Sequence, residues 1–270
     1  MIAIGNITKM KPDYSGETVQ YKLTLSDSEI DMNSLIGKEV RITFLNRINC
    51  VVCGVEIRST YAGRAMCKQC YETAPQAEEC LFYPEKCKAH LGVARDMEWS
   101  KKQCLIPHFV YLSLSSGLKV GVTRHHQIPV RWIDQGAVRA IKLAETPNRH
   151  IAGVIEVFLK KHVADKTSWK KMLKSQSSDF EINLVTEKIR VAELLPGALK
   201  QYVTDDNKVL EIDYPLSPAP ENPKTFNLEK EVEIKNIIAG IKGQYLLFKN
   251  GYVLNLNKYS GFFIEMEYPD

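Results

Sequence analysis

All seven cysteines of the chain fall within one stretch, and the first four are regularly spaced. Cys50 and Cys53 form one Cys-x2-Cys pair, and Cys67 and Cys70 form a second pair after thirteen intervening residues. Each pair can present two sulfurs from one tight turn, and together they make a tetrahedral cage that suits zinc. Gly54 follows the first pair, where the turn favours a residue that tolerates positive φ. The spacing predicts a structural zinc site, in preference to disulfides or a redox-active thiol pair.

A second set of potential metal ligands follows the first. It consists of Cys80, Cys87, His90 and Cys104. Three thiolates and one imidazole complete a tetrahedron, so the sequence predicts a second zinc here. The spacing is less regular, and a surface histidine after a turn is an equally good interpretation of His90. Two zinc ions would order a segment that has little apolar core, because structural zinc supplies on the order of 10 kcal/mol of folding free energy.

Composition narrows the class of protein. Of the 270 residues, 44% are hydrophobic and 25% are charged, which is typical of a soluble protein of one to three domains. No apolar run approaches the roughly 20 residues of a membrane span, and the N-terminus does not resemble a signal peptide. Paired thiols without a secretion signal favour the cytoplasm. The net charge of +4 does not by itself indicate a nucleic-acid partner.

The two ends of the chain are both rich in predicted strands. Apolar and polar residues alternate in Tyr21–Leu25 and Val40–Phe44, the pattern of half-buried strands. Near the other end, Asn250-Gly251 lies between two apolar runs and predicts a hairpin turn. A last strand is expected over Phe262–Met266. We therefore expect an α+β protein in which the two β-rich ends pack together.

The sequence predicts five consecutive regions. A proline-rich linker is expected because prolines recur between residues 214 and 223, where neither helix nor central strand is favoured. The regions are a β-rich segment at 1–48, the cysteine region at 49–104, a central domain at 105–202, the linker at 203–223 and a β-rich segment at 224–270.

The central domain has an alternating order of strands and helices. Strands are predicted at Val110–Leu114 and Leu118–Val122, around a short turn. Pro129 opens a short helix that ends at Gly136, and a third strand follows at Ala140–Ala144. Thr146-Pro147 then cap a longer helix with an apolar stripe and with Glu156 at its border, and a further helix is expected over 179–195. These elements predict a short antiparallel sheet flanked by helices.

The residues at fixed points of this order resemble the GIY-YIG nuclease superfamily. Val110-Tyr111 stands where that family has its first tyrosine triplet, and Lys119-Val120-Gly121 stands at the second triplet. Arg131 has the position of the helix arginine, and Glu156 that of the metal-binding glutamate. The likeness covers about 60 residues. Over its full length the chain also resembles an uncharacterised bacterial family that combines cysteine clusters with such a block.

The resemblance implies metal-assisted hydrolysis of phosphodiesters. Glu156 would hold Mg²⁺, which prefers oxygen ligands, and Arg131 with Arg124 would neutralise charge on the phosphate. Tyr111 would position or deprotonate the attacking water. Lys119 replaces the family's second tyrosine and is a poor base unless burial lowers its pKa. A degenerate fold that binds nucleic acid without cleaving it is therefore the alternative function.

Each of these residues also has an ordinary structural interpretation. Tyr111 fits a strand aromatic of the core, Glu156 fits a helix residue paired with Lys160, and Arg131 fits an amphipathic helix face. A basic stretch follows, in which six lysines stand against one acid, Asp165. These lysines could bind nucleic-acid phosphates, although a solvated charged face is equally compatible with them. They are Lys160, Lys161, Lys166, Lys170, Lys171 and Lys174.

Overall fold

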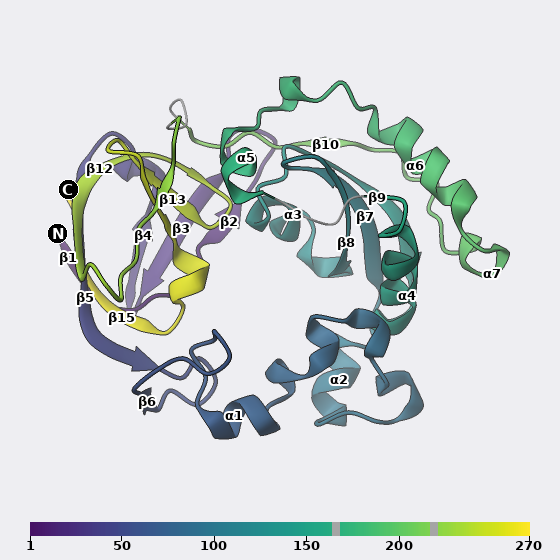
Figure 1. The fold of residues 1–270 in the computed structure, drawn as a ribbon, viewed down its shortest axis with the longest axis horizontal. Helices are drawn as coiled ribbons and strands as arrows, with labels where there is room; N and C mark the ends of the chain where they lie inside the picture. Colours follow the sequence, from purple (N-terminus) through teal and green to yellow (C-terminus); the bar gives the residue numbers. More distant parts are fainter. Residues whose placement is uncertain (164–167, 217–220) are drawn as a thin grey trace. The chain divides into compact units, whose positions relative to one another are not determined.

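The computed structural model describes residues 1–163, 168–216 and 221–270 of the chain, and it shows the predicted α+β fold (Figure 1). The chain divides into two compact units. Unit 1 comprises Met1–Glu72 and Asp213–Asp270, and unit 2 comprises Thr73–Ile212. In the part of the chain that is described, no helix is long and apolar enough to cross a membrane.

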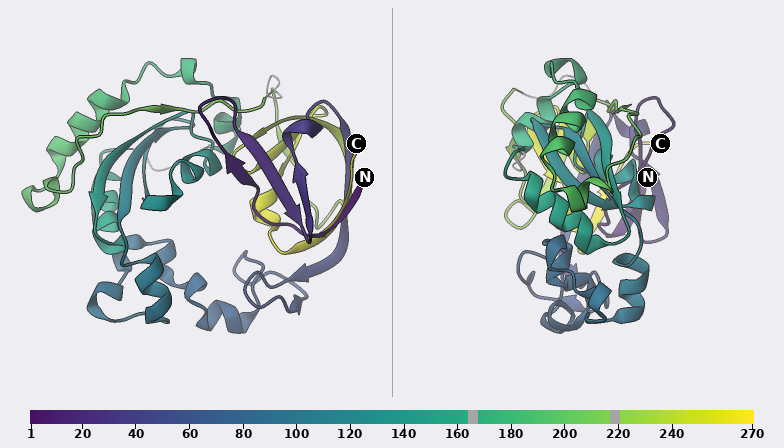
Figure 2. Two further views of the ribbon diagram at one scale, coloured as in Figure 1. Left: turned by 180° about the vertical axis from the view of Figure 1, so that it is seen from behind. Right: turned by 90° about the vertical axis from the view of Figure 1, so that its right-hand side faces the viewer.

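Unit 1 is built around one large sheet and one small sheet. Its elements are β1 (Ile2–Asn6), β2 (Lys11–Asp13), β3 (Gln20–Leu25), β4 (Ser28–Asp31), β5 (Glu39–Asn49), β6 (Glu56–Ile57), α1 (Lys68–Thr73), β11 (Lys224–Thr225), β12 (Glu233–Lys242), β13 (Tyr245–Phe248), β14 (Tyr252–Asn255) and β15 (Phe262–Glu267). The large sheet has the order β1-β15-β5-β12-β13-β14-β11, with β6 on β5. The small sheet, β2-β3-β4, is visible in purple in the left view of Figure 2.

The large sheet joins the two ends of the sequence. β15 pairs with both β1 and β5, and β12 lies on the other side of β5, all antiparallel. The predicted alternation of β5 is seen in its burial, because Val40, Ile42 and Phe44 are buried between partly exposed neighbours. The predicted hairpin at Asn250-Gly251 joins β13 to β14, and Gly251 takes a φ of +86° that a side chain would disfavour.

Unit 2 contains a four-stranded antiparallel sheet with helices packed on it. Its elements are α2 (Met97–Gln103), β7 (His108–Leu114), β8 (Leu118–Arg124), α3 (Val130–Asp134), β9 (Arg139–Thr146), α4 (Arg149–Leu159), α5 (Trp169–Lys174), α6 (Leu184–Leu194), α7 (Gly197–Lys200) and β10 (Leu210–Glu211). The sheet order is β10-β9-β7-β8. α4 packs on β7, β8 and β9, and α6 packs on β9 and β7 (Figure 1). Because β7 is central, nearly all of its residues are buried.

Two helix boundaries differ from the prediction. Thr146 is still part of β9, where its buried hydroxyl donates to the His108 carbonyl oxygen at 3.1 Å. The cap of α4 is therefore Asn148, whose side chain accepts the Ile151 N–H at 3.0 Å. The helix expected over 179–195 begins only at Leu184, because Ser177–Asp179 forms a separate 3-10 turn.

The segment expected as a linker contributes backbone pairing to both units. Thr204 donates its N–H to the Leu143 carbonyl at 3.0 Å, and β10 pairs with β9, within unit 2. In unit 1, the Ile241 N–H bonds to the Pro215 carbonyl at 2.9 Å, and a Cβ on Gly240 would lie 2.8 Å from the Leu216 Cα. The prolines of this segment thus occur where the chain passes from one unit to the other.

Candidate functional site

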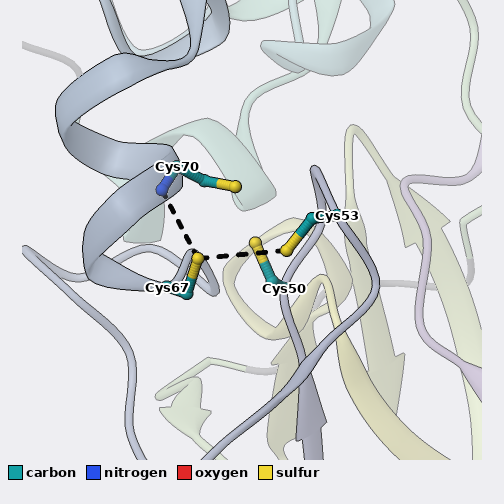
Figure 3. Close-up of side chains that lie close together, drawn as sticks. All are labelled: Cys50, Cys53, Cys67 and Cys70. Carbon is teal, nitrogen blue, oxygen red and sulfur yellow. Dashed lines mark hydrogen bonds between the residues drawn. The ribbon is translucent and has the colours of Figure 1, made fainter.

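The first four cysteines converge in unit 1, as Figure 3 shows. Cys50 directly follows β5, Cys53 lies in the turn after it, and Cys67 and Cys70 come from the start of α1. All four sulfurs lie within 4.8 Å of one another, and the Sγ atoms of Cys53 and Cys67 are 3.9 Å apart. Zn–S bonds of about 2.3 Å in a tetrahedron place sulfurs about 3.8 Å apart. This cluster could therefore hold a metal ion.

The turns around this cluster favour thiolates. Gly54 has a φ of +75°, as predicted, and its N–H donates to the Cys50 carbonyl at 2.8 Å. The Cys70 N–H donates to the sulfur of Cys67 at 3.4 Å (Figure 3). Burial raises the pKa of the Cys50 thiol, but backbone donors, first those of Cys53 and Cys67, outweigh it and bring the pKa to about 6. A thiolate is the form that binds a metal.

A second cluster lies in unit 2 and consists of three buried cysteines, Cys80, Cys87 and Cys104. Their sulfurs lie within 4.8 Å of one another, so this group could also hold a metal ion. Hydrogen bonds, first from Cys80 and then from Cys87, hold the pKa of the Cys104 thiol at about 2, far below its usual value. Negative charge therefore collects on Cys104 inside a buried site, which suits a cation.

Among the described residues, the second cluster consists of the three cysteines and does not include His90. Its ring stacks on His150 with centroids 4.4 Å apart, and His150 in turn bonds to the Glu85 carbonyl through Nδ1 at 2.7 Å. The ligand group thus consists of three cysteines, without the histidine that was expected to complete it. His90 is close to these cysteines along the chain, but its ring contacts α4 through His150.

The five residues predicted to carry chemistry line one pocket of unit 2, with a volume of about 430 Å³. Tyr111 comes from β7, Lys119 and Arg124 from β8, Arg131 from α3 and Glu156 from α4. Phe82 and Pro84, which lie between Cys80 and Cys87 in the sequence, form another part of the wall.

The electrostatic character of the pocket is strongly positive. Five cationic side chains and, among the described residues that line it, one carboxylate face the pocket. The cations are Lys119, Arg124, Arg131, Arg149 and Lys160, and the carboxylate is Glu156. Positive charge in a concave site attracts anions.

Tyr111 is fully buried in the wall of the pocket. Its hydroxyl donates to Gln135 Oε1 at 2.7 Å, and its ring lies against the backbone of Gly121 on the neighbouring strand. Burial raises the pKa of Tyr111 to about 12, although the charge of Arg131 opposes the shift. The phenol is therefore protonated at neutral pH and acts as a hydrogen-bonding group. Tyr111 therefore belongs to the buried core and also lines the pocket.

Glu156 lies on the face of α4 that packs on the sheet and is 8% exposed. Its carboxylate is 3.6 Å from the Lys160 ammonium, one helical turn later, so the pairing anticipated from the sequence is present. The pair lies at the pocket, where Glu156 is the available oxygen ligand for a hard cation.

Sequence reasoning misses several polar residues of the pocket, among them Arg149, His108 and Gln135. Arg149 is 8% exposed at the first position of α4, and its Nη2 donates to the Gln103 carbonyl at 3.1 Å. His108 opens β7 and is 1% exposed, and Gln135 holds the Tyr111 hydroxyl. None of the three belongs to a recognisable motif, and the fold alone brings them to the pocket.

The predicted basic stretch is divided by the fold. Lys160 lines the pocket, and Lys161 is exposed just beyond α4. Lys170, Lys171 and Lys174 are exposed on α5, which packs through Met172 on Gly136, directly after α3. Lys166 lies outside the described residues. α5 thus lies next to the end of the segment that carries Arg131, and its lysines are exposed.

Comparison with known proteins identifies a family for this chain. Residues 37–264 match the sequence model of a family described as "Protein of unknown function (DUF2797)". No curated protein and no solved structure matches the chain. The matched range covers most of both units and contains both cysteine clusters and the whole pocket.

Proposed function

The chain belongs to the family described as "Protein of unknown function (DUF2797)", and from this premise we propose that it is a zinc-containing, metal-dependent phosphodiesterase acting on nucleic acid. The observation that carries the proposal is the convergence of Tyr111, Arg131 and Glu156 on one positively charged pocket. The order strand, strand, helix, strand, helix from β7 to α4 also agrees with the resemblance to GIY-YIG nucleases.

Zinc is the metal that best suits the two cysteine clusters. Sulfur ligands in a small cage favour zinc over magnesium or calcium, which prefer oxygen. The first cluster offers a complete set of four thiolates, and the second offers three. Zinc in the second cluster would be structural, because Cys80, Cys87 and Cys104 are buried and do not line the pocket. Thiolates stay reduced most readily in the cytoplasm, where we expect this protein.

A divalent cation such as Mg²⁺ fits the carboxylate of Glu156. Carboxylate oxygen, water and substrate phosphate are the ligands that Mg²⁺ prefers in phosphoryl-transfer sites. When bound, the ion would supply positive charge to the phosphate and an activated water. Lys160 lies 3.6 Å from the Glu156 carboxylate and would give way to the ion or contact the substrate.

The chain's own residues bind and orient the phosphate. Arg131 presents a guanidinium group, which holds phosphate oxygens through paired hydrogen bonds. Tyr111, protonated and fixed by Gln135, positions the attacking water instead of deprotonating it. Lys119 offers a further cation to the phosphate. The exposed lysines of α5 would contact the strand beyond the pocket and release counterions.

Cleavage assays with purified, zinc-loaded protein test this proposal. With Mg²⁺ or Mn²⁺, labelled single- and double-stranded DNA and RNA should be cut, and Glu156→Gln should abolish cutting. Glu98→Gln is a matched control, because Glu98 is an exposed acid of the same unit that pairs at the surface with Lys101. Cleavage that persists unchanged in Glu156→Gln would exclude the assigned metal ligand.

A non-catalytic nucleic-acid-binding module is the second candidate. The raised pKa of Tyr111 favours it, since a protonated phenol is not a base at neutral pH, and so does Lys119, which stands in place of the family's second tyrosine. Salt-dependent binding without cleavage under any divalent metal would support this function over the first.

A further inference from the structure

One end of the pocket contains two arginines that the proposed hydrolysis of a single phosphate does not need. Arg124 ends β8, and Arg149 begins α4. Burial, followed by repulsion from Arg149, lowers the pKa of Arg124, so two cations are held close together in a partly dry site. His108 lies with them but adds no charge, because burial lowers its pKa to about 4. The charge of the Cys104 thiolate acts on both arginines from the neighbouring cluster and offsets part of this repulsion, and an anion in the pocket would offset the rest.

One donor of Arg149 is unused at this end of the pocket, although the guanidinium also neighbours the Cys104 thiol. Arg149 lines the pocket and is 8% exposed, yet its Nε has no hydrogen-bond partner among the described residues. A buried guanidinium N–H without a partner costs free energy that a bound acceptor would recover. The N-terminus of α4, at the same place, adds the positive end of the helix dipole.

This end is separate from the end that holds Glu156. Arg149 precedes Glu156 by seven residues of α4, which at roughly 1.5 Å per residue is about 10 Å. Along β7, His108 precedes Tyr111 by three residues, which is also about 10 Å. One phosphate at Tyr111 and Glu156 would therefore leave Arg124 and Arg149 free to bind another group.

We propose that Arg124 and Arg149 bind a second phosphate of the same nucleic-acid strand, next to the phosphate held at Arg131 and Glu156. The substrate is then a polynucleotide with consecutive phosphates, because a single phosphodiester is too small to occupy both positions. This inference rests on the proposed function for the class of ligand, and it adds a subsite that the resemblance to GIY-YIG nucleases does not supply. The five cations and one carboxylate that line the pocket leave more positive charge than one phosphodiester can balance.

Equilibrium binding without added Mg²⁺ tests the subsite independently of cleavage. The affinity of zinc-loaded protein for a fluorescein-labelled single-stranded oligonucleotide is measured by anisotropy from about 50 to 300 mM KCl. Arg124→Gln and Arg149→Gln should each weaken binding about ten-fold at roughly 100 mM, and each should reduce the slope of log K against log salt by roughly 0.7. Lys102→Gln removes an exposed charge of α2 in the same unit and should change neither quantity.

The outcomes separate this inference from the proposed function. If Glu156→Gln abolishes cleavage while both arginine variants keep the wild-type affinity and slope, the subsite is refuted and the nuclease stands. If no strand is cleaved but both variants lose affinity and slope, the subsite stands without the nuclease. Arg149 also bonds to the Gln103 carbonyl, so Arg149→Lys, which keeps the charge, and thermal melting control for loss of folding. Recovery of most of the affinity by Arg149→Lys is the expected result.

Discussion

The Tyr111 hydroxyl lies directly against the backbone of Gly121, its partner on the neighbouring strand. A Cβ at position 121 would be 2.5 Å from the Tyr111 oxygen and 2.6 Å from Cζ, closer than real carbon atoms approach. Gly121 is thus required for the space that it leaves to an aromatic ring. The glycine of the Lys119-Val120-Gly121 segment and the tyrosine of β7 form a single structural unit at the wall of the pocket.

Gly121→Ala should displace the Tyr111 ring and break its bond to Gln135. We expect the free energy of unfolding to fall by about 1–3 kcal/mol, the usual cost of overpacking a rigid core. Urea denaturation measures the change. Gly197→Ala is the matched control, because a Cβ there meets nothing within 4 Å at the start of α7, and alanine should be neutral or slightly stabilising. Equal stability of the two variants would contradict this interpretation of Gly121.

A second glycine, Gly153, lets α4 pack closely on the segment between Cys80 and Cys87. A Cβ on Gly153 would lie 2.1 Å from the Glu85 nitrogen and 2.4 Å from the Pro84 carbonyl carbon. Both are backbone atoms that cannot rotate away. Because Cys80 and Cys87 bracket this contact, α4 and the second cluster should be linked energetically.

Gly153→Ala should therefore loosen both α4 and the second metal site. The expected results are a loss of about 1–3 kcal/mol of unfolding free energy and a faster release of zinc to a chromogenic chelator. Val157→Ala shortens an exposed side chain on the same helix and should cost less than about 0.5 kcal/mol. Zinc release from Gly153→Ala at the wild-type rate would show that the contact does not support the cluster.

Zinc content distinguishes the two clusters and the role of His90. The wild-type chain should contain two zinc ions, while Cys53→Ser and Cys80→Ser should each contain one, as measured by elemental analysis of dialysed protein. His90→Ala should keep both ions, because its ring stacks on His150 instead of joining the three thiols. Loss of one zinc in His90→Ala would restore the set of three cysteines and one histidine that the sequence suggested.

The sequence was most informative where local chemistry determines geometry. The Cys-x2-Cys pairs and Gly54 predicted the first cluster, because a tight turn brings both sulfurs of a pair together whatever surrounds it. Alternation in Tyr21–Leu25 and Val40–Phe44 predicted strands for the same reason, since the period of a strand is local.

Long-range packing limited the rest of the prediction. His90 was assigned from spacing alone, and its actual neighbour, His150, is sixty residues away in the chain. Arg149 and His108 reach the pocket only because α4 packs on β7 and β8, which no short motif encodes. The cap of α4 was misplaced because Thr146 is retained in β9 by its bond to the His108 carbonyl.

The protonation state of Tyr111 predicts how its contribution depends on pH. Burial raises its pKa to about 12, so the folded protein keeps the proton while an unfolded tyrosine loses it near pH 10. The contribution of this proton to the free energy of unfolding is therefore fully present below about pH 10 and is lost as the pH rises from about 10 to 12.

A neutral phenol at position 111 that positions water should contribute equally to the cleavage rate at about pH 7 and pH 9. Tyr111→Phe should lower the cleavage rate about 10–100-fold by the same factor at both values. Comparison of wild-type and variant rates across this range checks the prediction, because a phenolate base would instead make their ratio rise about ten-fold with each pH unit.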